Sequence, residues 1–171
     1  VPCVSKCPAN VDVPGYIALV NSKKYKDAVR LIRKDNPFPV ACAFVCDHPC
    51  ESNCRRMIVD APINIRGIKG AAVHRSGFVK AEKPFPPTGK KIAIVGGGPS
   101  GLTAAYFLRL MGHTVSVYDA NDRLGGMLYY GIPRYRLPQK ELDRDINNII
   151  SLGIDVHLGE KIGEKITIDD L

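Results

Sequence analysis

A glycine pattern between an apolar strand and a helix restricts the fold of this chain most. Gly96, Gly98 and Gly101 fit the spacing G-x-G-x-x-G. The pattern follows the apolar run at residues 92–95 and precedes a segment of helical length at residues 99–111. By itself the spacing is weak, but in a strand–turn–helix context its glycines allow the backbone to approach a pyrophosphate. The sequence therefore predicts a Rossmann-like βαβ unit; a purely structural turn is the alternative.

The residues after the turn extend this unit. Gly112 ends the predicted helix, residues 114–118 predict the second strand, and Asp119 stands at the end of that strand. A carboxylate at this place can hydrogen-bond ribose hydroxyls, while the N-terminus of the preceding helix supplies N–H groups to a pyrophosphate. An amphipathic helix is expected after Pro138, followed by a short third strand at residues 154–158.

A second glycine pair favours FAD over NAD. Gly125 and Gly126 lie beyond the second strand, where a simple NAD domain needs no such pair. In flavoproteins of the disulfide-reductase type, a similar Gly-Gly segment passes close to the flavin side of the cofactor. We therefore predict an FAD-binding domain.

Cysteine spacing is the second strong feature. Cys3 and Cys7 are separated by three residues, and the same spacing repeats through residues 42–54, so that all six cysteines fall in the first 54 residues. A cubane cluster needs four soft thiolates from a compact region, and Cys7 is followed by proline as in ferredoxin-type runs. On a helical backbone the repeated spacing would place successive thiols on one side. This pattern predicts a [4Fe-4S] cluster.

Two other uses of the cysteines remain open. A disulfide framework is less favoured, because the second half contains no cysteine and nothing else indicates secretion. Structural zinc usually takes closer C-x2-C pairs, often with histidine, and His48 inside the run could serve it.

The chain divides at a proline-rich segment. Residues 84–90 predict a linker between an α-helical [4Fe-4S] ferredoxin-like domain at residues 1–83 and the N-terminal part of a Rossmann-like FAD-binding domain at residues 91–171. Within the first domain, helical spacing appears at residues 13–20, 22–34 and about 64–79, the last with Asn64 as its N-cap.

Charge is unevenly distributed along the chain. Residues 1–90 hold 15 lysines and arginines against 7 acidic residues, whereas residues 91–171 hold 9 against 10. The basic residues are scattered without interleaved aromatics, which argues against nucleic-acid binding. They would instead offset the negative charge of thiolate-ligated clusters. Glycines interrupt the longest uncharged stretch, so no membrane span is expected. The chain starts without methionine and ends where Thr167 and two acids resemble a beginning helix, so we expect both ends to be truncated.

Together these motifs resemble the small subunit of the NADPH-dependent glutamate synthase family. The resemblance rests on the order of a Cys-Pro run, a Cys-Glu-x2-Cys block, a Pro-Ile-Asn-Ile segment, Val-Gly-Gly-Gly-Pro-Ser-Gly-Leu and Gly-Ile-Pro-x-x-Arg-Leu-Pro. Related proteins are the N-terminal half of dihydropyrimidine dehydrogenase and the large subunit of ferredoxin-dependent NADP transhydrogenases. The similarity covers nearly all 171 residues.

The resemblance implies specific metal ligands. One [4Fe-4S] cluster would be held by Cys7, Cys46, Cys50 and Cys54, with Cys42 as a spare thiol. A second cluster of the family would use Cys3, two further upstream cysteines and a Glu or Gln. Lys69 occupies that Glu or Gln position, and a protonated amine cannot ligate iron.

The resemblance also implies the FAD site and the reaction. The pyrophosphate is assigned to Gly96, Gly98, Pro99, Ser100 and Gly101, the ribose to Asp119, and the rest of FAD to Gly125, Gly126, Met127 and Arg136. Electrons would pass from NADPH or NADH through FAD and the cluster to a partner such as the glutamate synthase large subunit or another redox protein. No residue is needed as a general base, so no catalytic residue is assigned.

Further expectations and alternatives accompany this assignment. The nicotinamide site is expected after Leu171, so the fragment alone should be inactive. We expect a cytoplasmic protein. The alternatives are the flavin subunit of a transhydrogenase, formate dehydrogenase or hydrogenase complex, and, outside enzymes, a zinc-stabilised interaction module with a Rossmann-like domain.

Overall fold

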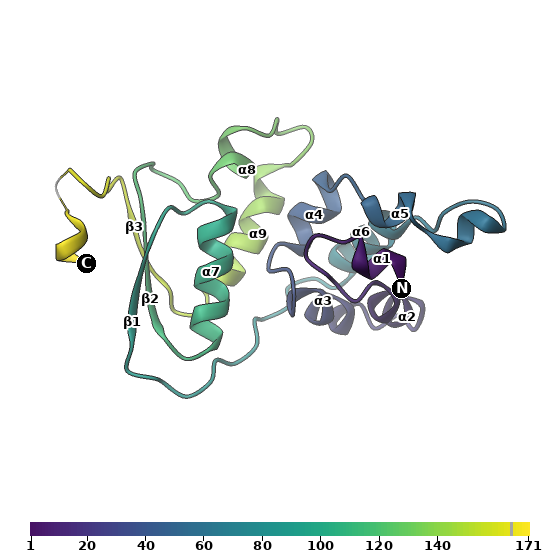
Figure 1. The fold of residues 1–171 in the computed structure, drawn as a ribbon, viewed down its shortest axis with the longest axis horizontal. Helices are drawn as coiled ribbons and strands as arrows, with labels where there is room; N and C mark the ends of the chain where they lie inside the picture. Colours follow the sequence, from purple (N-terminus) through teal and green to yellow (C-terminus); the bar gives the residue numbers. More distant parts are fainter. Residues whose placement is uncertain (165) are drawn as a thin grey trace. The chain divides into compact units, whose positions relative to one another are not determined.

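The computed structural model describes residues 1–164 and 166–171, and it divides into two compact units, Val1–Val79 and Lys80–Leu171. Figure 1 traces both units along the chain. The first unit consists of helices and loops, whereas the second contains a parallel sheet with helices. None of the helices in the described ranges combines the length and apolar character needed to cross a bilayer.

The first unit is a set of short helices around one core. Its longer helices are α2 (Val13–Asn21), α3 (Tyr25–Arg33) and α6 (Ile65–Arg75), which pack against one another. Tyr16, Ile32 and Ile65 from these three helices are at most 2% exposed. Burial of such side chains supplies most of the stability of helices this short. The shorter elements are α1 (Pro2–Ser5), α4 (Pro39–Val45), α5 (Pro49–Ser52) and the 3₁₀ helix η1 (Arg55–Ile58).

Helix α6 begins directly after the predicted N-cap, Asn64, and ends earlier than expected. The side chain of Asn64 accepts a hydrogen bond from the Gly67 N–H at 2.8 Å, which confirms it as the N-cap. The predicted end near Val79 is wrong, because the helix stops at Arg75. Gly77, with φ of +62°, turns the chain into the left-handed region and so prevents continuation.

Gly70 offers a test of the α6 backbone. It lies inside this helix, and a Cβ added there would meet nothing within 4 Å. We expect Gly70→Ala to raise the free energy of unfolding by about 0.4–1 kcal/mol, because alanine reduces the freedom of the unfolded chain. Urea unfolding followed by circular dichroism measures this change, and a loss of stability would contradict the described helix.

The cysteine-rich stretch is not one continuous helix, so the repeated spacing lies on a helical backbone only in part. Helix α4 ends at Val45, Cys46 is extended with ψ of 135°, and α5 starts anew at Pro49. A residue before proline is kept out of the right-handed helical region. His48 lies outside that region but adopts left-handed rather than extended angles, φ 48° and ψ 53°. The chain therefore turns sharply between Cys46 and Cys50.

The second unit is a three-stranded parallel sheet in the order β1-β2-β3, with helices between the strands. The strands pair in register at Ile92 with Val115 and at Val117 with Val156. Helix α7 packs on β1 and β2, and α9 packs on α7 (Figure 1). The strands are β1 (Lys91–Val95), β2 (Thr114–Asp119) and β3 (Asp155–Leu158); the helices are α7 (Pro99–Leu110), α8 (Met127–Tyr130), α9 (Gln139–Ile150) and η2 (Ile168–Asp170).

The proline-rich segment belongs to this second unit. The Phe85 N–H donates to the Leu110 carbonyl at 2.8 Å, and the Thr88 N–H donates to the Gly112 carbonyl at 3.0 Å. These bonds fasten the segment to the end of α7. At the other end of the chain, Thr167 and Asp170 form a capping box on η2, as the sequence predicted for a helix start.

Candidate functional site

Four of the six cysteines lie around one buried hydroxyl in the first unit. Burial raises the pKa of the Tyr16 hydroxyl, and the thiolates of Cys50, Cys7, Cys3 and Cys46 raise it further. The hydroxyl donates to a carbonyl of α6 at 3.3 Å. The fold thus brings the N-terminal Cys-x3-Cys pair into the same neighbourhood as the second cysteine block.

The cysteines of the first unit are not joined by disulfides. Among the residues that the structure describes, no disulfide framework is formed. Within residues 1–164 and 166–171, no group of three or more Cys, His, Asp or Glu side chains is arranged to hold a metal ion. A cubane spreads its ligands more widely, because each thiolate binds a different iron. Cys54 interacts electrostatically with Arg56 and is not among the cysteines that act on the Tyr16 hydroxyl.

Lys69 acts electrostatically on the Cys50 thiol. Burial raises the pKa of the Cys50 thiol, whereas the Lys69 ammonium opposes that rise and Cys46 adds to it. Lys69 is itself only 8% exposed, on α6. A positive charge at this depth stabilises a neighbouring thiolate, which is the form that binds iron. Lys69, which the resemblance predicts at the position of a Glu or Gln ligand, thus acts as a positive charge on the Cys50 thiol.

The predicted glycine turn joins β1, β2 and α7 tightly. The Gly96 N–H donates to the Tyr118 carbonyl at 2.7 Å, and Gly98 is the N-cap of α7. A Cβ on Gly101 would lie 1.9 Å from the Gly96 carbonyl oxygen. Only glycine permits this approach, which places the first N–H groups of α7 beside the end of β1. Pro99 and Ser100 form the first turn of that helix.

The second glycine pair lies directly against this turn. The Gly125 N–H donates to the Gly97 carbonyl at 2.8 Å. Gly126 has φ of +49°, and a Cβ there would lie 2.8 Å from the Gly98 Cα. The two glycine segments that were predicted to share a ligand therefore share one short backbone contact. Met127 follows as the first residue of α8 and is 70% exposed.

Arg136 lies apart from the glycine contact. It is exposed, and its backbone N–H donates to the Pro133 carbonyl at 2.9 Å. No described hydrogen bond joins its side chain to the glycine segments. Its assignment to FAD stays a prediction.

Asp119 holds the glycine turn in place. Its Oδ2 accepts from the Gly97 N–H at 2.6 Å, while its Oδ1 accepts from the Asn121 N–H at 2.8 Å and from the Asn121 side-chain amide at 2.9 Å. A carboxylate offers about four acceptor positions. Three are thus occupied by the protein, which leaves one for a ribose hydroxyl.

These donors also set the ionisation of Asp119. Burial alone would raise its pKa, but the N–H groups of Asn121 and Gly97 and the Asn121 amide hold the pKa below its ordinary value. A depressed carboxyl pKa contributes stability above the unfolded-state pKa, and that stability is lost as the pH falls through the folded-state pKa.

An Asp119→Asn variant tests this arrangement. At neutral pH we expect the free energy of unfolding to fall by about 1.5–3 kcal/mol, because charge-assisted hydrogen bonds are lost. The deficit should be complete above the ordinary carboxyl pKa of about 3.9 and should shrink below it, where the wild-type carboxylate is protonated. Urea unfolding across this pH range measures the difference, and a deficit that did not change with pH would contradict the proposed charge.

Several residues of these sites were missed from the sequence. Asn121 and Leu124 complete the glycine turn, the latter by filling the space above Gly97, where a Cβ would lie 2.3 Å from its Cδ2. In the first unit, Tyr16 and the pair Glu51 and Arg66 were also missed. Among these, the Cys-Glu sequence at residues 50–51 offered a signal, since an acidic residue inside a ligand run needs a partner.

Comparisons with known proteins match both units. Residues 1–76 match the family described as dihydropyrimidine dehydrogenase domain II, 4Fe-4S cluster, and residues 94–156 match the NAD(P)-binding Rossmann-like domain. The first unit is thus similar to a 4Fe-4S domain of this type, and the second unit is similar to an NAD(P)-binding Rossmann-like domain.

Similar full-length proteins come from several bacteria. The chain is 40% identical to the NADPH-Fe(3+) oxidoreductase subunit beta of Geobacter sulfurreducens, over 99% of the chain and 26% of that protein. It is 37% identical to the glutamate synthase [NADPH] small chain of Bacillus subtilis, over 98% of the chain and 34% of that protein. It is 36% identical to the NADP(+)-dependent formate dehydrogenase subunit beta of Moorella thermoacetica, over 99% of the chain and 27% of that protein. The chain spans about a third or less of the length of these relatives.

Proposed function

Because the chain is a homologue of glutamate synthase small chains and of related oxidoreductase beta subunits, we propose that it binds FAD and a [4Fe-4S] cluster and passes electrons between them. The observation that carries this proposal is the contact between Gly126 and Gly98, which joins the two glycine segments of the Rossmann-like unit. A ligand at the N-terminus of α7 would meet both segments, as an extended dinucleotide requires.

The proposed cluster ligands are Cys7, Cys46, Cys50 and Cys54. The position of Cys7, Cys46 and Cys50 around Tyr16 supports three of these four assignments. Cys3 shares that neighbourhood, and we keep it as a ligand of a second cluster in the whole protein. The described residues form no disulfide, and we propose that the protein lies in the reducing cytoplasm.

The proposed FAD site follows the glycine contact. The backbone N–H groups of Gly98 and Ser100 lie at the start of α7, where we propose that the pyrophosphate binds. Pro99 lies between them and has no N–H, which the first turn of a helix does not need. Asp119 would accept one ribose hydroxyl. The groups assigned to the rest of the cofactor are Gly125, Gly126, Met127 and Arg136.

In this proposal the residues of the chain bind the two cofactors, orient them and balance the charge of the thiolates. When bound, FAD and the cluster would convert between two-electron and one-electron transfer. Lys69 offsets the thiolate charge, and the close glycine packing excludes side chains from the pyrophosphate position. For the whole protein we propose that NADPH or NADH is the donor and that a partner redox subunit, such as a glutamate synthase large subunit, is the acceptor. Membership of a formate dehydrogenase, transhydrogenase or hydrogenase complex is the alternative.

Light-driven reduction of bound flavin tests the electron path. The anaerobic chain, reconstituted with iron, sulfide and FAD, is illuminated with a sacrificial donor and then frozen for EPR. We expect flavin bleaching to be followed by the signal of a reduced cubane. A chain that binds FAD and reduces it without any cluster signal would refute transfer between the two groups, and a colourless chain with stoichiometric zinc would support the interaction-module alternative.

A further inference from the structure

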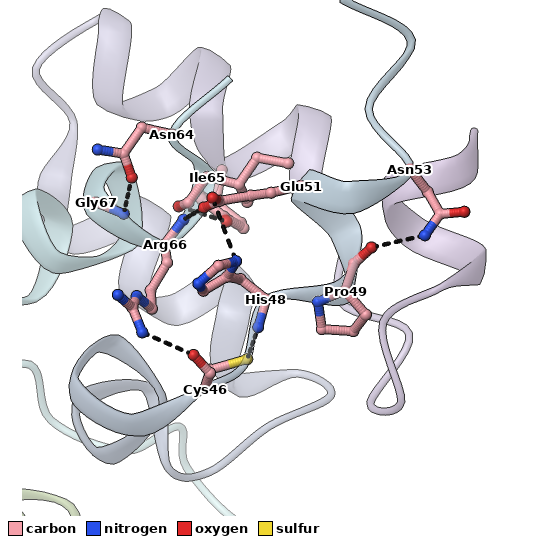
Figure 2. A network of polar contacts seen from close by, with 10 residues as sticks. Cys46, His48, Pro49, Glu51, Asn53, Asn64, Ile65, Arg66 and Gly67 are labelled. Atoms are coloured by element: carbon pink, nitrogen blue, oxygen red, sulfur yellow. Dashed lines mark hydrogen bonds and ion pairs between the residues drawn. The ribbon is translucent and has the colours of Figure 1, made fainter. Parts of the chain in front are cut away.

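A closed set of polar contacts joins the ligand loop, which we define as residues 46–54, to the first turn of α6 (Figure 2). The Arg66 guanidinium donates from Nη1 to the Cys46 carbonyl at 2.9 Å. The backbone N–H of the same residue donates to Glu51 Oε1 at 2.8 Å. Since Glu51 directly follows Cys50, one residue of α6 holds the ligand loop on both sides of its turn.

The site of these contacts makes them strong. Asn64 already caps the Gly67 N–H, and Glu51 accepts from the preceding free N–H of the helix, at Arg66. A carboxylate at a helix N-terminus is favoured by the helix dipole, and both bonds involve a charged group. The Glu51 side chain is only 17% exposed, so water competes weakly for it.

The turn between Cys46 and Cys50 contains a residue in a disfavoured backbone conformation. His48 adopts the left-handed region, which is disfavoured for residues with a Cβ. Its backbone N–H donates to the Cys46 Sγ at 3.3 Å, and its Nδ1 lies 3.4 Å from Glu51 Oε2 (Figure 2). The turn between Cys46 and Cys50 is therefore held by contacts with neighbouring groups rather than by local backbone preference.

We propose that Glu51 and Arg66 are positioning residues, which fix the separation of Cys46 and Cys50 before iron arrives. This inference rests on the proposed function, because it takes these two cysteines as cluster ligands. Groups that orient metal ligands commonly change metal affinity by about 10- to 100-fold when they are removed. Neither side chain needs to touch iron to have this effect.

Iron release to a chelator tests the proposal in the reconstituted 171-residue chain. We expect Arg66→Met and Glu51→Ala each to speed iron release by about 10- to 100-fold and to alter the EPR line shape of the reduced cluster. Glu51→Gln keeps an oxygen that can accept the Arg66 N–H, and should stay within a few-fold of wild type. Arg30→Met is the matched control, since Arg30 forms an exposed ion pair with Asp27 on α3.

The outcomes separate this proposal from the proposed function. If the wild-type chain takes up a cluster, and Arg66→Met and Glu51→Ala release iron at its rate with an unchanged line shape, the positioning role is overturned while the proposed function stands. If the wild-type chain takes up no iron, both are overturned. Loss of helical circular dichroism in the iron-free Arg66→Met chain would also overturn the positioning role, because the contacts would then hold the helices rather than the ligands.

Discussion

A Cys50→Ala chain is expected to lose almost all of its iron, from roughly four irons per chain to a small remaining fraction, together with the EPR signal of the reduced cubane. Cys50 is the most buried of the six cysteines, and both Lys69 and Cys46 act on it electrostatically. Water cannot readily replace a ligand at this depth, so the cluster should be lost rather than rearranged. Iron and sulfide analysis after anaerobic reconstitution measures the effect.

The chain provides its own control for this variant. Cys42 lies in the same cysteine-rich stretch but is left out of the proposed ligand set, and its Sγ accepts a hydrogen bond from the Asn36 side-chain amide at 3.1 Å. Cys42→Ala should therefore keep the full iron content. Equal losses in the two variants would show that the ligand assignment within residues 42–54 is wrong.

The second large effect is expected at Gly101. Replacing it by alanine puts a methyl group 1.9 Å from the Gly96 carbonyl oxygen, which is backbone and cannot swing away. Strand β1 and helix α7 must then separate, at a cost of about 3 kcal/mol or more in the free energy of unfolding. The turn that should carry the pyrophosphate would open, so FAD binding should fall below detection.

Urea unfolding and a fluorescence titration with FAD measure these two effects of Gly101→Ala. Gly70→Ala makes the same chemical change in α6, where nothing obstructs it, and is expected to stabilise the chain. A Gly101→Ala chain with wild-type stability would contradict the described packing of α7 on β1. One with reduced stability but unchanged FAD affinity would place the flavin elsewhere.

Local patterns were enough to predict much of the architecture. The Asn64 cap and the apolar strand containing Val115 and Val117 follow from side-chain chemistry within a few residues. The short helices α1, α4 and α5 were missed because each begins at a proline that also suits a turn. Their existence depends on packing that a single window of sequence does not contain.

The candidate sites also combine features that the sequence predicted with features that only the fold provides. The glycine and cysteine spacings identified which residues to consider, whereas the contacts that hold them depend on the fold. The bond from Arg66 to Glu51 spans 15 residues, and the bond from Gly97 to Asp119 spans 22. At His48 the local pattern was insufficient. The regular cysteine spacing is compatible with a helix, but the chain turns at His48, immediately before Pro49. Long-range acceptors and left-handed residues therefore had to come from the structure.

Joint quantification of iron, sulfide and flavin in the anaerobically reconstituted chain, with an EPR spectrum after reduction, tests whether the chain binds both a cubane and FAD. We expect roughly four irons and four sulfides, about one FAD and a cubane signal. Tightly bound zinc, with neither iron nor flavin, would contradict the proposed function.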